Sequence, residues 1–174
     1  MERLAAAGVG AGRRSEVRLR RAASSDGARV NELVAAAYSH YVPLIGRTPI
    51  PMLTDYVQAV DARDVWVLAE GDVIVGVLDL DPHEDHLWLE NVAVLPARQG
   101  AGLGRLLLEH AEAVARERGL PEIRLLTNDR YVSNIAMYER HGYAETHRQP
   151  HLGTDLVYFA KPIELDRSSA RGVP

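Results

Sequence analysis

The chain has 174 residues, of which 47% are hydrophobic and 25% charged, a composition typical of one globular domain rather than a disordered chain. Its net charge of −4 argues against a nucleic-acid-binding protein, which usually presents a strongly basic face. The absence of cysteine excludes disulfides, thiolate zinc sites and a cysteine nucleophile. No apolar run approaches the roughly 20 residues that span a bilayer, and no secretory signal is evident. We therefore expect a cytoplasmic protein with neither nucleic-acid nor membrane partners.

The first half of the chain predicts one strand, two helices and a proline-rich loop. We expect a flexible leader at residues 1–15, a single domain at 16–163 and a flexible tail at 164–174. Alternation predicts a strand at 17–21, and residues 24–26 have the side chains that begin a helix reaching Tyr38. Three prolines and a glycine predict a loop at 41–51, and a second helix is expected at 52–62.

The second half of the chain predicts a run of strands interrupted by two helices. Strands at 65–70, 73–80 and 86–94 are separated by short polar turns, as in consecutive hairpins. A long amphipathic helix at 102–118 ends at Gly119, and a strand follows at 123–127. A short helix at 134–140 precedes closing strands at 143–148 and 156–161. Without long alternation of strands and helices, this order predicts an α+β fold around a mixed sheet.

Three glycines stand where the strand ending at Val94 turns into the long helix: Gly100, Gly102 and Gly104. Glycine allows positive φ and leaves no Cβ to obstruct an anion, and the first amides of a helix lie at the positive end of its dipole. The turn therefore predicts a phosphate cradle, although a tight turn without a ligand has the same composition. The spacing fits neither the dinucleotide fingerprint nor the P-loop.

Two segments together resemble the GNAT superfamily of N-acetyltransferases. One is Gln99-x-x-Gly102-x-Gly104, preceded by Val94-x-Pro96, and the other runs from Asn134 through Tyr138 to Gly142-Tyr143. The resemblance covers roughly residues 17–162. It implies a mostly antiparallel, mixed sheet of about seven strands flanked by about four helices. The sheet would be splayed between the strand ending near Val94 and the strand at 123–127.

The resemblance also implies that acetyl-CoA is the acyl donor, with no metal. Backbone groups of Val92, Ala93 and Val94 would pair with the pantetheine arm like an added strand. Asn134 would contact the same arm. The pyrophosphate would be held by the amides of the glycine turn, which are those of Gln99, Gly100, Ala101, Gly102, Leu103, Gly104 and Arg105.

Two side chains are candidates for proton transfer. By resemblance, Tyr138 protonates the departing thiolate, which suits a phenol with an ordinary pKa of about 10; a plain packing role is the alternative. Glu90, two residues before Val92, is a candidate for the base that accepts a proton from the amine. A solvent-facing glutamate, with water as the base, is the alternative. The histidines of the polar turn, His83 and His86, lack a metal-site spacing, and no metal is expected.

The segment from Tyr38 to Tyr56 is a candidate wall for the acceptor. Tyr38, Tyr41, Arg47 and Tyr56 provide aromatic and hydrogen-bonding groups of the kind that line small-molecule pockets. In the resembling family this region faces the acceptor.

These residues predict transfer of an acetyl group from acetyl-CoA to a primary amine of a small molecule, by direct attack in a ternary complex. Acetylation of a protein or peptide N-terminus is an alternative. A non-catalytic domain that binds or senses acyl-CoA is another, and the presence of both Asn134 and Tyr138 disfavours it. The expected partner is thus a small amine or a peptide, and the sequence leaves a homodimer open.

Overall fold

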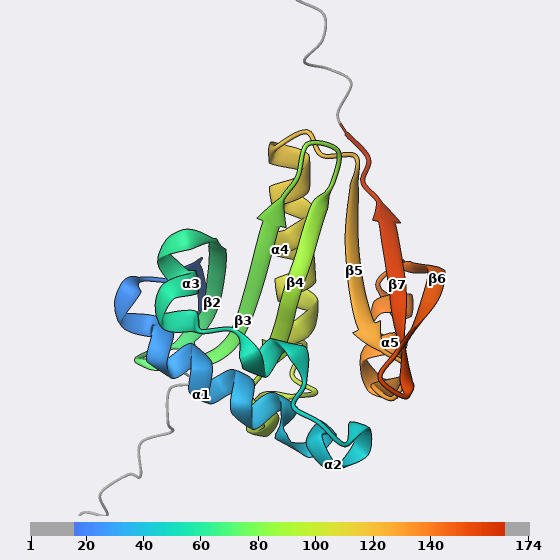
Figure 1. The fold of residues 1–174 in the computed structure, drawn as a ribbon. Helices are drawn as coiled ribbons and strands as arrows, with labels where there is room; N and C mark the ends of the chain where they lie inside the picture. The colour runs from blue at the N-terminus through green and yellow to red at the C-terminus, as the bar shows by residue number, and fades with distance from the viewer. Residues whose placement is uncertain (1–15, 166–174) are drawn as a thin grey trace, which may run out of the picture.

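The computed structural model describes residues 16–165, which form a seven-stranded sheet with helices on both faces (Figure 1). The strand order is β1-β2-β3-β4-β5-β7-β6. Neighbouring strands are antiparallel except β4 and β5, which are parallel. The predicted mixed, mostly antiparallel sheet is therefore confirmed. Its strands are β1 (Val17–Arg21), β2 (Asp64–Glu70), β3 (Val73–Pro82), β4 (Leu87–Val94), β5 (Glu122–Asn128), β6 (Ala144–His151) and β7 (Thr154–Pro162). The predicted leader and most of the predicted tail lie outside the described residues.

Four helices of seven or more residues and one single-turn helix accompany the sheet. They are α1 (Gly27–Tyr38), α2 (Val42–Ile45), α3 (Tyr56–Ala62), α4 (Leu103–Glu117) and α5 (Val132–Arg140). In the described part of the chain, none of the helices has the length and apolar character needed to cross a bilayer.

The segment between α1 and α3 differs from the predicted loop and helix. Instead of a loop throughout 41–51, it contains α2, where Pro43 takes a first-turn position that needs no amide donor. Gly46 then ends this helix with a left-handed φ of 69°. The next helix begins at Tyr56 rather than at residue 52, because Thr54 is extended and the Asp55 side chain caps the amide of Val57.

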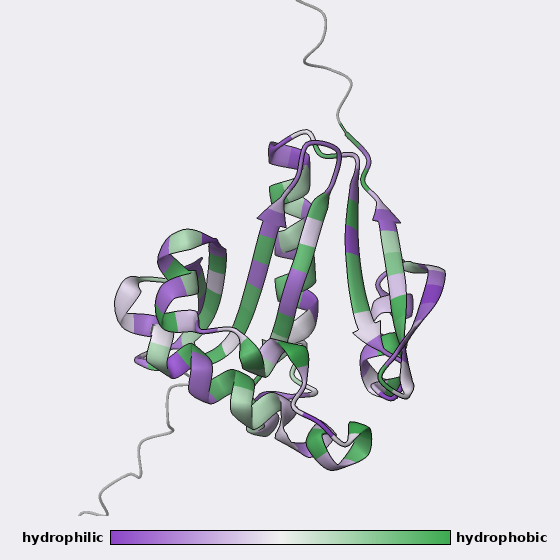
Figure 2. Ribbon diagram, in the orientation of Figure 1, coloured by the Kyte–Doolittle hydropathy of each residue, from purple (hydrophilic) through white to green (hydrophobic). Residues whose placement is uncertain are grey.

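Hydrophobic residues pack on both faces of the sheet because successive side chains of a strand point to opposite faces. In β3, Val77 joins a core with α1 and α3, whereas Leu78 joins a core with α4 and α5. Figure 1 shows α1 and α3 in front of the sheet and α4 behind it. In Figure 2 the hydrophobic colours follow the central strands and are interrupted by hydrophilic positions. The sheet is thus packed between two layers of helices.

Strands β4 and β5 pair at only two positions and then diverge, which confirms the predicted splay (Figure 1). The pairs are Leu87 with Ile123 and Trp88 with Arg124. On its other side β4 pairs with β3, but the register slips and leaves Glu90 without a partner residue. Such a bulge bends the strand that contains it. The edge of β4 after Trp88 is therefore open toward β5.

The segment between α1 and α3 crosses the open ends of the diverging strands. The Tyr41 hydroxyl lies 3.1 Å from Ser133 Oγ at the start of α5. Farther along, Arg47 donates to the carbonyl of Leu152 at 3.0 Å and to Thr154 Oγ1 at 3.1 Å. These contacts join the two halves of the sheet, so the split is covered along one side.

Candidate active site

The split between β4 and β5 holds two cavities, of about 370 Å³ and about 120 Å³. The larger, which we call the outer cavity, lies between the start of α4 and α5. The smaller, the inner cavity, lies between the diverging strands under the α1–α3 segment. Tyr38 and Asn134 line both. The two cavities are therefore neighbours at these two residues.

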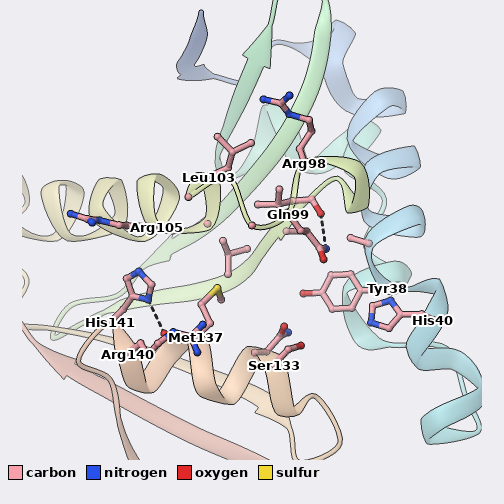
Figure 3. Close-up of a pocket in the computed structure, with 18 of the residues that line it drawn as sticks. Tyr38, His40, Arg98, Gln99, Leu103, Arg105, Ser133, Met137, Arg140 and His141 are labelled. Carbon is pink, nitrogen blue, oxygen red and sulfur yellow. Dashed lines mark hydrogen bonds between the residues drawn. The ribbon is translucent and has the colours of Figure 1, made fainter. Parts of the chain in front are cut away.

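The glycine turn forms one wall of the outer cavity, opposite Ser133, Met137 and Arg140 of α5 (Figure 3). Within the described chain, none of the six backbone amides from residue 100 to residue 105 donates a hydrogen bond to another residue. The first amide of α4 to do so is that of Leu106, which bonds to Gly102. Unpaired amides at a helix start favour a bound anion.

The glycine positions fit a phosphate group. Gly100 and Gly102 have φ values of 78° and 79°, and a Cβ at either would meet no protein atom within 4 Å. A side chain there would instead occupy the space next to the free amides. At Gly104 a Cβ would lie 3.3 Å from Met137 Sδ, so α4 and α5 approach closely at this point. Arg140 also lines the cavity and has no carboxylate within 4.0 Å in the described chain.

The open edge of β4 continues the wall of the outer cavity. Val92, Ala93 and Val94 all line it, as an extended strand that β5 no longer pairs. Gln99 donates from Nε2 to the carbonyl of Val94 at 3.2 Å, which ties the turn to this strand. All predicted cofactor residues except Ala101 line the outer cavity. The arrangement can bind a ligand with an extended arm and a phosphate end.

The inner cavity is mostly apolar and aromatic. Its charged side chains are Arg47 and Glu90, one of each sign. The aromatic rings belong to Tyr38, Trp88, Tyr131 and Tyr138. Aliphatic residues and proline form most of the remaining wall, with a few neutral polar groups: Ile45, Ile50, Pro51, Leu89, Asn91, Leu126, Thr127, Asn128, Asn134 and Leu156.

Tyr138 brings a protonated phenol to this cavity. It lies on α5, is 4% exposed and packs edge-on against Tyr143 and at a tilt against Phe159. Burial raises the pKa of Tyr138 above its ordinary value, because the charged phenolate is poorly solvated there. The hydroxyl makes no hydrogen bond to another described residue. Its proton is therefore present at neutral pH and free to be donated.

A buried chain of hydrogen bonds orients the Tyr38 hydroxyl where the cavities meet. Tyr38 donates to Asn91 Oδ1 at 2.8 Å, and Asn91 Nδ2 donates to the Tyr56 hydroxyl at 3.0 Å. Because the Tyr38 proton is used in this bond, its oxygen presents a lone pair to other donors. Burial raises the pKa of Tyr131 to about 12, so this phenol of the inner cavity is also protonated at neutral pH.

Behind this chain lies the buried carboxylate of Asp79. Burial first, and then the nearby charge of Glu90, raises the pKa of Asp79 to about 6 even though Arg63 opposes both effects. Arg63 Nη1 donates to Asp79 Oδ2 at 3.0 Å, but Oδ1 has no hydrogen-bond partner among the described residues. Glu90 therefore lies close enough to the buried carboxylate of Asp79 for their charges to interact.

The other predicted site residues differ in where they lie relative to the two cavities. Glu90 is exposed and lines the inner cavity with Arg47, whereas Tyr41 lines the outer cavity. Tyr56 is 1% exposed and lines neither cavity, so it reaches the site only through Asn91. Sequence reasoning missed Asn91 and Tyr131. The sequence does contain a signal for Asn91, because it is an uncharged polar residue in the mostly apolar strand β4, directly after Glu90.

The splayed sheet, the free amides of the turn and the two neighbouring cavities are typical of an acyltransferase. Residues 30–143 match the family model described as "Acetyltransferase (GNAT) family". The match covers more than half of the chain, which therefore belongs to the GNAT acetyltransferase family.

Known proteins resemble the chain over part of their length. It is 34% identical over 86 residues to the mycothiol acetyltransferase of Jonesia denitrificans, a match covering 48% of this chain and 27% of that protein. It is 36% identical over 87 residues to the [ribosomal protein bS18]-alanine N-acetyltransferase of Escherichia coli K12, with coverage of 47% and 59%. The chain thus spans less than two thirds of each of these relatives.

A solved structure shares the fold over most of both chains. The paiA N-acetyltransferase of Thermoplasma acidophilum, in complex with coenzyme A, superposes with a TM-score of 0.73. The two chains are 14% identical, and the match covers 84% of this chain and 99% of the other. The splayed arrangement is therefore that of known acetyltransferases.

Proposed function

We propose that the protein transfers the acetyl group of acetyl-CoA directly to a primary amine of a small molecule, with both substrates bound at once. One observation carries this proposal. A cavity lined by free backbone amides meets, at Tyr38 and Asn134, a second cavity lined by Tyr138 and Glu90. The first suits a phosphate-bearing donor and the second has side chains suited to moving protons.

The outer cavity is the proposed site of acetyl-CoA, which supplies the acetyl thioester. The amides of residues 100–105 bind its pyrophosphate, and Arg140 adds a charge without a carboxylate partner. The edge of Val92, Ala93 and Val94 binds the pantetheine amides, and Asn134 contacts the same arm from α5. Coenzyme A bound to the Thermoplasma protein of the same fold supports this assignment.

Tyr138 is the proposed general acid. As the bond from the acetyl carbon to nitrogen forms and the bond to sulfur breaks, the Tyr138 hydroxyl donates its proton to the leaving sulfur. Its raised pKa keeps the hydroxyl protonated at neutral pH, and the same poor solvation makes a thiolate beside it more basic than in water. The packing of its ring between α5 and β7 fixes the direction of the hydroxyl.

Glu90 is the proposed acceptor of the amine proton, directly or through water. It lines the inner cavity at the bulge of β4, where a bulge turns a side chain away from the regular ladder. Its exposure gives the proton a route to solvent. The Tyr38 oxygen, oriented by Asn91, is placed to accept a hydrogen bond from the same amine.

A small acceptor fits the inner cavity better than a protein chain, because its volume is about 120 Å³ and the α1–α3 segment covers it. The relatives described above include both a mycothiol acetyltransferase and a ribosomal-protein alanine N-acetyltransferase. Acetylation of a peptide N-terminus is therefore the competing proposal. A non-catalytic acyl-CoA-binding domain has no need for the free phenol of Tyr138.

The test is amine-dependent release of the coenzyme A thiol from acetyl-CoA, measured over a panel of primary amines and peptides. The proposal expects thiol release matched by one equivalent of N-acetylated product in mass spectra. Thiol release with peptides alone would support the competing proposal. Tight binding of acetyl-CoA without turnover of any amine would identify a binding domain.

A further inference from the structure

The inner cavity has one fixed cation and one fixed anion in an otherwise neutral wall, namely Arg47 and Glu90. We infer that the acceptor is a zwitterion, an amino acid with an apolar side chain, whose carboxylate binds Arg47 and whose amine lies beside Glu90. This inference rests on the proposed function, because it names the substrate class of the proposed acceptor site. It assigns to Arg47 the role of determining specificity.

Arg47 is held in place by neutral groups. It donates to the carbonyls of Leu152 and His151 and to Thr154 Oγ1, at 3.0, 3.5 and 3.1 Å. All three acceptors belong to the end of β6, the β6–β7 turn or the start of β7. They fix the position of the guanidinium without neutralising its charge. The N–H groups that these bonds leave over, on Nε and Nη1, are available to a carboxylate in the cavity.

Within residues 16–165, the absence of a carboxylate near Arg47 is unusual. Of the fourteen arginines in residues 16–165, ten lie within 4.0 Å of an Asp or Glu oxygen. The four others are Arg18, Arg29, Arg47 and Arg140. Arg140 lines the outer cavity, where we place the phosphates, and Arg47 lines the inner one. Both unpaired cavity arginines are thus matched to a ligand anion.

The part of the wall around Glu90 favours a cation. Glu90 interacts unfavourably with buried Asp79, whose pKa it raises. An ammonium group beside Glu90 compensates this local excess of negative charge. The Tyr38 hydroxyl oxygen, at the meeting point of the cavities, accepts a hydrogen bond from the same amine. The amine is thereby placed next to the outer cavity, where the acetyl group arrives.

Apolar residues fill the wall around these two charges. Ile45, Ile50, Trp88, Leu126 and Leu156 offer contacts to a side chain and few hydrogen bonds. A polar or charged side chain directed at these five residues would lose its hydration without compensation. Together with the small volume, these walls favour an aliphatic amino acid such as leucine.

Three matched acceptors measure how much the carboxylate contributes to acceptor recognition: leucine, leucinamide and 3-methylbutylamine. The last two lack the negative charge, and leucinamide also resembles the N-terminus of a peptide. We expect wild-type kcat/KM for leucine to exceed that for leucinamide at least tenfold, as charge-assisted hydrogen bonds to a carboxylate imply. In Arg47→Gln this ratio should fall about tenfold, and Arg47→Lys should retain part of it.

Comparing ratios between variants cancels the different basicities of the three amines. It also separates recognition from loosening of the loop, because a loosened loop lowers turnover of leucine and leucinamide equally. Arg29→Gln is the matched control, since Arg29 is exposed on α1 and lines neither cavity; its ratio should equal that of the wild type.

Two results would overturn the inference alone: equal wild-type turnover of leucine and leucinamide, or an unchanged ratio in Arg47→Gln. In either case acetylation of the amines still supports the proposed function. Failure of all three amines would also overturn this inference alone, whereas the proposed function fails only if no amine of the wider panel releases thiol from acetyl-CoA.

Discussion

The outer and inner cavities are built from different parts of the chain. One wall of the outer cavity consists of backbone groups, namely the amides of the glycine turn and the open edge of β4, whereas α1 and α5 provide side chains for the rest. The inner cavity is enclosed by side chains from α1, the α1–α3 segment, β4, β5, α5 and β7. A backbone site keeps its shape when side chains change. A side-chain site changes with each substitution and so determines which acceptor is used.

This difference between the cavities predicts that the largest loss of activity follows from removing a single side-chain atom in the inner cavity. Tyr138→Phe keeps the ring between Tyr143 and Phe159 but removes the proton donor. We expect kcat to fall by about 10²–10⁴-fold, the range for loss of a general acid, with the affinity for acetyl-CoA nearly unchanged. Steady-state kinetics and calorimetric titration measure the two effects separately.

Tyr143→Phe is the control for this variant. The Tyr143 hydroxyl is buried, has no hydrogen-bond partner among the described residues and lines neither cavity. Its removal should leave kcat within about twofold of the wild type. If Tyr138→Phe turns over a good acceptor at the wild-type rate, with chemistry limiting, Tyr138 has only a packing role.

In the outer cavity the sensitive positions are glycines. Gly102→Val places a branched side chain beside the free amides and adds strain of about 1–3 kcal/mol at a positive φ. We expect the folded variant to bind CoA about a hundredfold more weakly, because several charge-assisted hydrogen bonds are obstructed. Dephosphorylated pantetheine should lose much less affinity, since it lacks the pyrophosphate.

Gly71→Val is the matched control, because Gly71 has a φ of 59° and a Cβ added there would likewise meet no atom within 4 Å. It lies in the β2–β3 turn and lines neither cavity. This variant should lose similar stability while CoA affinity stays unchanged. Equal loss of affinity for CoA and pantetheine in Gly102→Val would refute the phosphate role of the turn.

Asp79 provides a stability test of the side-chain network behind the inner cavity. Its folded-state pKa of about 6 lies above the ordinary value of a carboxyl group, so the folded protein holds this proton more tightly. The stabilisation is fully present below about pH 4 and is lost as the pH rises through 6, by about 2 kcal/mol. Urea titrations of wild type and Asp79→Asn at pH 4 and pH 7 measure it.

We expect the stability difference between Asp79→Asn and the wild type to shift in favour of the variant from pH 4 to pH 7. Taking this difference removes the contributions of other titrating groups. A shift in the opposite direction would mean that the attraction of Arg63 outweighs the burial of Asp79.

The smallest effect is expected from a side chain of the outer cavity. Arg105 pairs with Glu109 on the surface of α4 at 2.6 Å, and its proposed contact with the pyrophosphate is through its amide. Arg105→Gln should weaken CoA binding less than about threefold and leave the stability of the fold close to that of the wild type. A much larger loss of CoA affinity would show that the guanidinium itself binds the phosphates.

The same contrast explains what the sequence can predict. Alternation and helical periodicity specify all seven strands and the long helices, because local spacing determines which face is buried. The glycine turn is also local, so most outer-cavity residues can be named. The inner cavity depends on distant segments meeting. Asn91 of β4 bonds to Tyr38 of α1 and Tyr56 of α3, and nothing in the spacing of these residues indicates the contact.

The short helix α2 and the true start of α3 escape sequence reasoning for a related reason. Prolines usually indicate a break in a helix. Pro43, however, lies in the first turn of α2 and Pro51 in that of the 3₁₀ helix Ile50–Leu53, where proline favours a helical turn. The burial of Tyr56 against Asn91 is likewise set by tertiary packing. Local patterns thus predict the cofactor half of the site better than the acceptor half.

The most direct test of the two-cavity account is a crystal structure of the protein with coenzyme A. The account predicts the pyrophosphate within hydrogen-bond distance of the amides of residues 100–105, and the pantetheine along Val92 to Val94. The sulfur should lie where Tyr38 and Asn134 join the cavities, facing the Tyr138 hydroxyl. Coenzyme A bound elsewhere, or with its sulfur directed away from the inner cavity, would contradict the account.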